Sequence, residues 1–178
     1  MIDRDNVHPT AWLHPRCEAH GVTIGAYTKV WQFATVIRKS VVGEHCNIAS
    51  CAIVDGALVG DNCIIGHSAF IAPGIVIGND VFIGPHVSMC NDYWPRVAKD
   101  GWFDIQKLID REIIVTAIED GASIGVNAVI IPGVTIGARA MVAAGAVVRC
   151  NVPPDFLYQR DGSLVPITGE PNRMRTCS

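Results

Sequence analysis

The 178-residue chain has few charged and few aromatic residues, 17% and 7% of the sequence. Its 14 Lys and Arg stand against 17 Asp and Glu, a formal net charge of −3, and basic residues form no run. Nucleic acid is therefore not expected as the main partner, because its phosphates attract clustered positive charge. The apolar fraction of 49% is too high for a disordered chain. It predicts a packed core, a subunit interface or both.

Cysteine is present but forms no Cys-x-x-Cys pair, and its seven positions are 17, 46, 51, 63, 90, 150 and 177. This odd, scattered set favours reduced thiols in the cytoplasm over a disulfide framework or a zinc ribbon. Cys46, Cys51 and Cys63 are expected to act as small buried hydrophobic residues. Residues 1–6 hold no apolar run, so no signal peptide is expected, and no stretch has the pattern of a membrane helix.

What the sequence does have is an aliphatic residue at every sixth position. Most of these residues precede a glycine or another small residue. The frame loses one residue near Val54-Asp55-Gly56, which predicts a shortened turn there. Three runs carry the repeat: 24, 30, 36, 42 and 48; 59, 65, 71, 77, 83 and 89; and 118, 124, 130, 136, 142 and 148.

A period of six fits neither an α-helix nor a freely alternating strand. It fits a triangular coil of parallel strands, in which each side is one short strand plus one turn and three sides need about 18 residues. The aliphatic residue should point inward, and the following glycine should supply the backbone freedom of a tight corner. A small residue at the fifth place of the repeat should also face inward: Thr28, Ala69, Ala122, Ala128, Ala140 and Ala146.

The repeat resembles that of the hexapeptide-repeat acyltransferases over residues 7–153. This resemblance implies an all-β fold, a left-handed parallel β-helix. It places a β-helix domain at residues 1–153 and a cap or tail at 154–178. It also implies a homotrimer with sites between subunits, and Trp31, Phe33, Phe70 and Phe82 are candidate interface residues.

The repeat is interrupted once, over residues 90–115, and a loop of this length inside a compact repeat is usually functional. Residues 104–112 are predicted to form a short helical turn with Ile105, Leu108 and Ile109 on one side. After the repeat, residues 156–167 predict two short strands around Asp161-Gly162. Residues 169–173 differ from the turn and helix common in the family.

The start of the interruption resembles acetyltransferases that act on nucleotide-linked 3-amino sugars. The resemblance rests on Asn91, Asp92, Pro95 and Arg96, with Gly84-Pro85 ahead. It implies acetyl transfer from acetyl-CoA to the amine of such a sugar, for surface polysaccharide. Met89-Cys90 replaces the family's usual aromatic-Thr pair, so the particular sugar is not implied.

Acetyl transfer to an amine needs positioning, a donor for the oxyanion and a proton acceptor. His86 is the candidate general base, since imidazole titrates near neutrality. Asn91 is the candidate that orients either the amine or the thioester. The candidate substrate-binding residues are His67, Asp92, Tyr93 and Arg96, of which Asp92 can equally cap a loop and Arg96 can equally form a surface ion pair.

For acetyl-CoA, the family uses a groove between subunits near the C-terminal coils. The candidate residues are Gly125, Arg139, Ala143, Ala144, Gly145 and Arg149. The small ones leave room for a pantetheine arm, and the two arginines are candidates for the phosphates.

Three alternatives remain open beside this function. Sugar or small-molecule O-acetylation needs a stronger base, and a non-catalytic β-helix scaffold needs no site at all. A γ-type carbonic anhydrase would need clustered zinc ligands. No metal is expected, because no two of the six histidines have a His-x-x-x-x-His spacing: 8, 14, 20, 45, 67 and 86.

Overall fold

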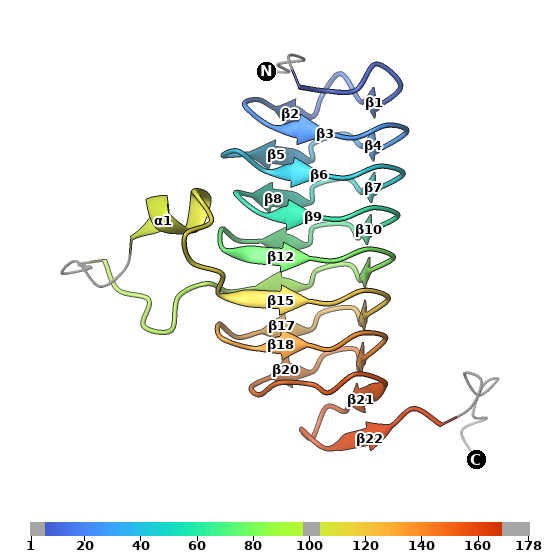
Figure 1. The fold of residues 1–178 in the computed structure, drawn as a ribbon, viewed down its shortest axis with the longest axis vertical. Helices are drawn as coiled ribbons and strands as arrows, with labels where there is room; N and C mark the ends of the chain where they lie inside the picture. Colours follow the sequence, from blue (N-terminus) through green and yellow to red (C-terminus); the bar gives the residue numbers. More distant parts are fainter. Residues whose placement is uncertain (1–5, 98–103, 169–178) are drawn as a thin grey trace.

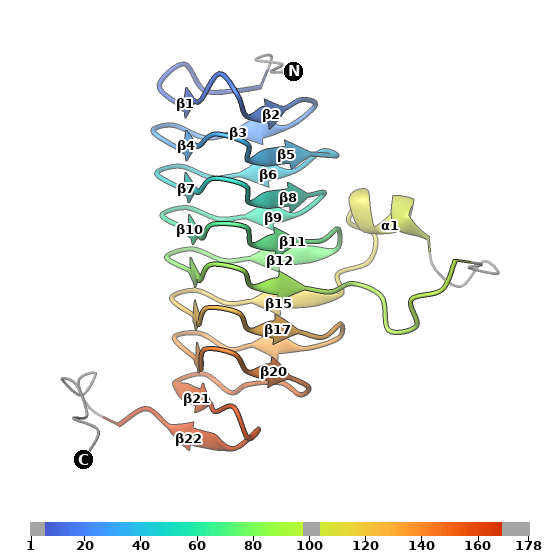
Figure 2. The same ribbon diagram turned by 180° about the vertical axis from the view of Figure 1, so that it is seen from behind.

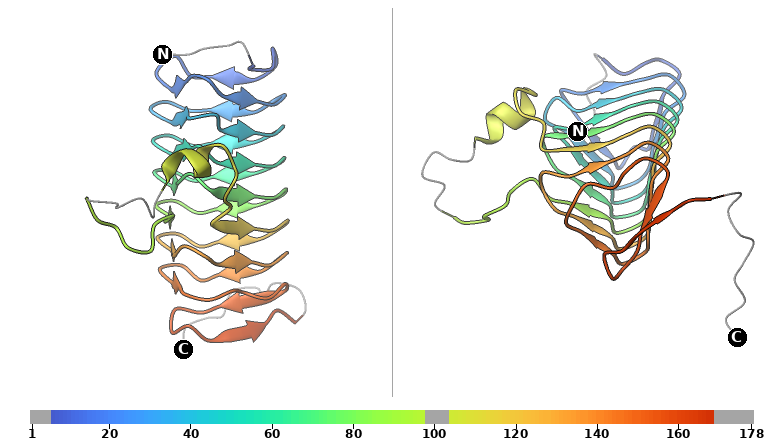
Figure 3. Two further views of the ribbon diagram at one scale, coloured as in Figure 1. Left: turned by 60° about the vertical axis from the view of Figure 1, so that its left-hand side comes forward. Right: turned by 60° about the horizontal axis from the view of Figure 1, so that its bottom comes forward.

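The computed structural model describes residues 6–97 and 104–168, which form a three-sided parallel β-helix (Figures 1 and 3). Each coil contributes one short strand to each of three sheets, as the six-residue repeat predicts. The strands of sheet 1 are, in order, β1 (Trp12–Leu13), β4 (Lys29–Val30), β7 (Asn47–Ile48), β10 (Ile64–Ile65), β13 (Phe82–Ile83), β16 (Ser123–Ile124), β19 (Met141–Val142), β21 (Phe156–Tyr158) and β22 (Leu164–Pro166).

Sheets 2 and 3 are parallel throughout. Sheet 2 consists of β2 (Glu18–Ala19), β5 (Thr35–Ile37), β8 (Ile53–Asp55), β11 (Phe70–Ile71), β14 (Ser88–Met89), β17 (Val129–Ile130) and β20 (Val147–Val148). Sheet 3 consists of β3 (Thr23–Ile24), β6 (Val41–Val42), β9 (Leu58–Val59), β12 (Ile75–Ile77), β15 (Thr116–Ile118) and β18 (Thr135–Ile136).

The chain runs from sheet 1 to sheet 2 to sheet 3 and back, so the prism has three edges made of turns. We call them edge 1–2, edge 2–3 and edge 3–1 after the sheets they join. In Figure 3 the three sides are visible in the view toward the C-terminal end.

The core is the stack of inward aliphatic residues. All the repeat positions predicted to point inward are buried, and so are the predicted small residues such as Thr28 and Ala128. Residues of successive coils pair in register, for example Ile65 with Ile83 and Ile83 with Ile124. Burial of each such side chain contributes about 1.5–3 kcal/mol.

The repeat requires glycine for a different reason from the predicted one. The residue with left-handed backbone is usually the one two places after it, such as Tyr27, His45, Ser68 and His86. Gly25 itself does not have positive φ. A Cβ on it would lie 2.6 Å from the carbonyl carbon of Gly43 in the next coil. Close approach of stacked backbones, rather than a special φ, therefore requires glycine there.

The expectation for the three cysteines holds for two of them. Cys46 and Cys63 are buried in adjacent coils, but Cys51 is exposed. Cys51 occupies the outward, left-handed place of its turn, and Ala52 takes the inward small place beside it.

The shortened turn is confirmed, since only Gly56 and Ala57 separate β8 from β9. The interruption leaves the prism at edge 2–3 and contains the helix α1 (Ile105–Ile109), beside the prism in Figures 1 and 2. Of the three residues predicted to share one side, Leu108 and Ile109 are buried, whereas Ile105 is exposed.

The C-terminal hairpin also forms, with β21 antiparallel to β22. β21 still pairs in parallel with β19, so the sheet continues to Tyr158, past the last repeat residue. The departure from the family at residues 169–173 lies outside the described residues.

Replacing Ile130 with Asp tests the inward assignment. Ile130 is 0% exposed, and an unpaired carboxylate among aliphatic side chains should lower the free energy of unfolding by several kcal/mol. Ile64→Asp is the matched control, because Ile64 points outward and is 44% exposed. Chemical denaturation measures both variants, and a wild-type midpoint for Ile130→Asp would contradict the assignment.

Candidate active site

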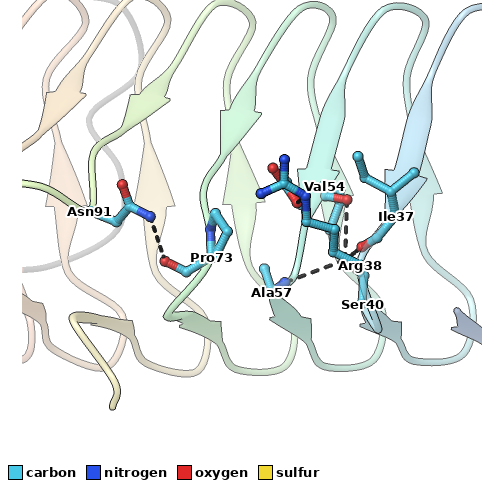
Figure 4. A network of polar contacts seen from close by, with 8 residues as sticks. Ile37, Arg38, Ser40, Val54, Ala57, Pro73 and Asn91 are labelled. Atoms are coloured by element: carbon cyan, nitrogen blue, oxygen red, sulfur yellow. Dashed lines mark hydrogen bonds and ion pairs between the residues drawn. The ribbon is translucent and has the colours of Figure 1, made fainter. Parts of the chain in front are cut away.

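Asn91, the second residue of the interruption, is hydrogen-bonded to the preceding coil. Its side-chain Nδ2 donates a hydrogen bond to the carbonyl oxygen of Pro73, 3.0 Å away, in the preceding turn of edge 2–3 (Figure 4). Asn91 is half-buried. Because this bond fixes the amide group, its oxygen Oδ1 is held on the side away from Pro73 (Figure 4).

The turns of edge 2–3 above Pro73 are held by further polar contacts (Figure 4). The Ser40 hydroxyl lies 2.6 Å from the carbonyl oxygen of Ile37 and accepts a hydrogen bond from the Ala57 N–H. Arg38 forms an ion pair of 3.3 Å with Asp55. Burial raises the pKa of Asp55, and the charge of Arg38 opposes part of that rise. These contacts join the turn at residues 38–40 to the shortened turn of the next coil.

Helix α1 packs against the same edge. Asp104 caps it by accepting the Gln106 N–H at 3.0 Å. Ideal Cβ atoms on Gly56 and Gly74 would lie 3.3 Å from Ile109 and 3.0 Å from Leu108. Edge 2–3 therefore has glycine, with no side chain, at the two positions where α1 packs against it.

Two polar contacts hold the end of α1 on the second coil. Lys39 Nζ lies 2.6 Å from Asp110 Oδ1, and the Arg111 guanidinium donates to the Lys39 carbonyl oxygen. The hydrogen bond from Lys39 holds the pKa of Asp110 below its usual value. The helix is thus attached to the prism by both apolar and charged contacts.

A cavity of about 350 Å³ lies between this segment and edge 2–3. Its residues are Asn91, Asp92, Tyr93, Asp104, Leu108, Ile113, Ile114, Val115 and Gly133. The Tyr93 hydroxyl lies against Gly133, where φ is +82° and a Cβ would collide with the phenol. Position 133 therefore requires glycine, both for its positive φ and for its contact with the Tyr93 hydroxyl.

The polar groups of this cavity are one amide, one phenol and two carboxylates, without Lys or Arg. Asp92 Oδ1 accepts a hydrogen bond of 2.9 Å from the Trp94 N–H, so this carboxylate caps the loop, one of its two expected roles. A cavity with this lining suits an uncharged or cationic group, such as a sugar ring with its amine, and disfavours a phosphate.

His86 lies elsewhere in the same chain, at edge 1–2, in the turn between β13 and β14. It is exposed and has left-handed backbone (φ 57°). All of β14 separates it from Asn91. His67 occupies the turn one coil above, and its carbonyl oxygen accepts the His86 N–H at 2.8 Å. The left-handed place that corresponds to His86 in that coil belongs to Ser68, so the two histidines are offset by one residue.

The structure therefore brings together Asn91, Asp92 and Tyr93 but not His86, His67 or Arg96. Arg96 is exposed and does not line the cavity. The sequence reasoning missed the apolar wall formed by Leu108, Ile113 and Ile114. The aliphatic residues that cluster near the end of the interruption could have predicted this wall.

The six residues expected at the acyl donor are divided among three edges. Gly125 and residues 143–145 follow His86 down edge 1–2, and Gly125 packs directly against the Ala144 backbone. Arg149 lies at edge 2–3, below the cavity. Arg139 lies at edge 3–1, where it is paired with Asp155 through hydrogen bonds of 2.7 and 2.6 Å. Those bonds raise the pKa of Arg139.

Among residues 6–97 and 104–168, no group of three or more His, Cys, Asp or Glu is arranged to hold a metal ion. In the same part of the chain, no helix is long and apolar enough to cross a membrane.

Comparison with known families matches both halves of the repeat. The family "GMPPB C-terminal domain" matches residues 1–93, and "Bacterial transferase hexapeptide (six repeats)" matches residues 116–150. Together with the prism, these matches define a left-handed hexapeptide β-helix. The chain belongs to the hexapeptide-repeat β-helix acyltransferase family.

Relatives in sequence include the "Bifunctional protein GlmU" of Heliobacterium modesticaldum, 33% identical over 85% of this chain and 24% of that protein. GlmU of Carboxydothermus hydrogenoformans is 30% identical over 87% of this chain and 26% of its own length. The chain spans about a quarter of the length of these curated relatives.

Solved structures share the fold at low identity. The acetyltransferase domain of PglB from Neisseria gonorrhoeae, in complex with acetyl coenzyme A, superposes with a TM-score of 0.51 and 18% identity. The match covers 90% of this chain and 56% of that one. A mutant of AntD, an N-acyltransferase from Bacillus cereus in complex with dTDP-4-amino-4,6-dideoxyglucose and coenzyme A, has a TM-score of 0.51 at 14% identity, covering 87% and 76%.

Proposed function

We propose that the protein transfers an acetyl group from acetyl-CoA to the amine of a nucleotide-linked amino sugar. The observation that carries this proposal is the cavity beside Asn91, which has an oriented amide, two carboxylates and an apolar wall. The family supports acyl transfer. The ligands named for PglB and AntD are the two substrate classes proposed here.

A homotrimer would bring His86 of one subunit close to Asn91 of the next. If sheet 2 of each prism faces a three-fold axis, edge 1–2 of one chain meets edge 2–3 of the next. Ile53 and Phe70 point outward from sheet 2 and are 36% and 38% exposed in the single chain, so this face offers apolar contacts, although Phe82 on sheet 1 is also exposed, at 41%. His86 of one subunit then lies beside the Asn91 cavity of its neighbour.

In this arrangement Asn91 Oδ1 accepts an N–H of the neutral amine and orients its lone pair toward the thioester carbonyl carbon. As the C–N bond forms, negative charge develops on the carbonyl oxygen. His86 takes the proton from the amine nitrogen, and the C–S bond then breaks to release coenzyme A as the thiol, with a proton returned to sulfur. The products are the amide and coenzyme A.

The small residues 125 and 143–145 lie below His86 on the same edge and leave space for the pantetheine arm. Arg149 of the neighbouring chain approaches this track from edge 2–3. We leave Arg139 out of the acyl-donor site, because Asp155 already pairs with it at another edge.

Thiol release tests the function. The chain is mixed with acetyl-CoA and either amino-sugar nucleotides or matched hydroxyl sugar nucleotides, and free coenzyme A is measured with a thiol reagent. Release should require the amine acceptor. Release with hydroxyl acceptors alone would identify an O-acetyltransferase, and the absence of release with every amine would refute the proposal.

A further inference from the structure

The three edges of the prism differ in charge. Edge 3–1 carries Glu44, Asp61 and Asp120, and edge 2–3 carries the carboxylates of the cavity. The turns of edge 1–2 contain no Asp or Glu: residues 14–17, 31–34, 49–52, 66–69, 84–87, 125–128 and 143–146. Since carboxylates repel phosphates at short range, edge 1–2 is the edge of the described chain best suited to a diphosphate.

A groove of about 340 Å³ lies on this edge, on the N-terminal side of His86. Its residues are Trp31, Gln32, Asn47, Ala49, Ser50 and His67. They provide one indole, amides, a hydroxyl and an imidazole, without a carboxylate. This chemistry matches a nucleobase, which stacks on aromatic rings and bonds to neutral polar groups.

The Trp31 ring is held in place from two sides. Its Nε1–H donates to Asn47 Oδ1 at 2.7 Å, and its ring packs edge to face with Trp12 at a centroid distance of 5.1 Å. Trp31 remains 38% exposed. A ring that is already oriented loses little conformational entropy when a base stacks on it.

The groove is also aligned with the proposed reaction centre. Trp31, Ser50, His67 and His86 belong to the turns of four successive coils. With about 4.8 Å between neighbouring strands, Trp31 and His86 lie about 14 Å apart along the axis. A base at Trp31 and phosphates beside His67 would bring the sugar to His86.

We propose that this groove binds the base and ribose of the nucleotide carried by the amino-sugar acceptor. This inference rests on the proposed function and adds to it the side from which each substrate approaches His86. The acceptor reaches His86 from the N-terminal coils, and the acyl donor reaches it from the C-terminal coils of the same edge.

The test is the affinity of the full chain for dTDP, UDP and ADP, measured by calorimetry without acyl donor. Trp31→Ala should weaken dTDP or UDP binding about 5- to 150-fold, the range expected for the loss of one stacked base. Tyr27→Ala is the matched control, since Tyr27 is an exposed aromatic residue at edge 3–1. This control should bind like the wild type.

Equal loss in both variants, loss in Tyr27→Ala alone, or nucleotide binding that Trp31→Ala leaves unchanged would overturn the inference. The acetyl-transfer assay separates it from the proposed function. Transfer with an unchanged KM for the acceptor in Trp31→Ala would refute the groove and leave the function standing. Trp31-dependent dTDP or UDP binding without transfer to any amine would refute the function and leave the groove standing.

Discussion

Replacing His86 with Ala should lower kcat for acetyl transfer about 10²- to 10⁴-fold, the usual contribution of a general base. The variant should melt like the wild type, because the His86 side chain is exposed and outside the core. Steady-state kinetics with saturating acetyl-CoA measures the effect.

Asn127→Ala is the matched control for this prediction. Asn127 occupies the left-handed place of His86 in the next coil and is also exposed, so it shares the backbone geometry without the imidazole. A mild decrease in His86→Ala, similar to that in Asn127→Ala, would contradict a histidine base. It would instead indicate substrate-assisted transfer with Asn91 as the positioning group.

Mixing His86→Ala and Asn91→Ala subunits in equal amounts should restore about a quarter of the wild-type rate. In a trimer whose site uses His86 of one chain and Asn91 of the next, half of the chains supply His86, and half of their neighbours supply Asn91. One site in about four is then intact, although each variant alone is nearly inactive. Co-expression in equal amounts, assayed without removing the homotrimers, measures this fraction; mixed trimers isolated with two affinity tags should instead have about one site in three intact.

The control mixture pairs His86→Ala with the double variant His86→Ala/Asn91→Ala, and it should stay inactive. Light scattering should give the mass of three chains for the wild type. A monomer in solution, or verified mixed trimers without recovered activity, would contradict a site shared between subunits.

Much of the fold was predictable because it depends on local spacing. When an aliphatic residue recurs at every sixth place, the chain can bury all of these residues only by winding into stacked coils. The repeat alone therefore predicts that Ile65, Ile83 and Ile124 lie in register. The missing residue near Val54 likewise predicted the short turn. The exposure of Cys51 was not predictable from residue type, because it depends on which place of the turn points outward.

The site was predictable only in part. Asn91, Asp92 and Tyr93 are adjacent in the sequence, and the structure places them in one cavity. His86 is only five residues before Asn91, yet a full strand carries the two to different edges. Residues close in the sequence can therefore lie far apart, because each strand of the prism carries the backbone from one edge to the next.

By itself, the sequence determined the repeat, the inward residues, the place of the interruption and the C-terminal hairpin, because each follows from a local pattern of side chains. The tertiary structure alone decided which residues share an edge: His86 with the small residues below it, Asn91 with the wall from α1, and Trp31 with the carboxylate-free turns. The physical reason is that stacking joins residues one coil apart, whereas the three-sided winding separates residues that are close in sequence.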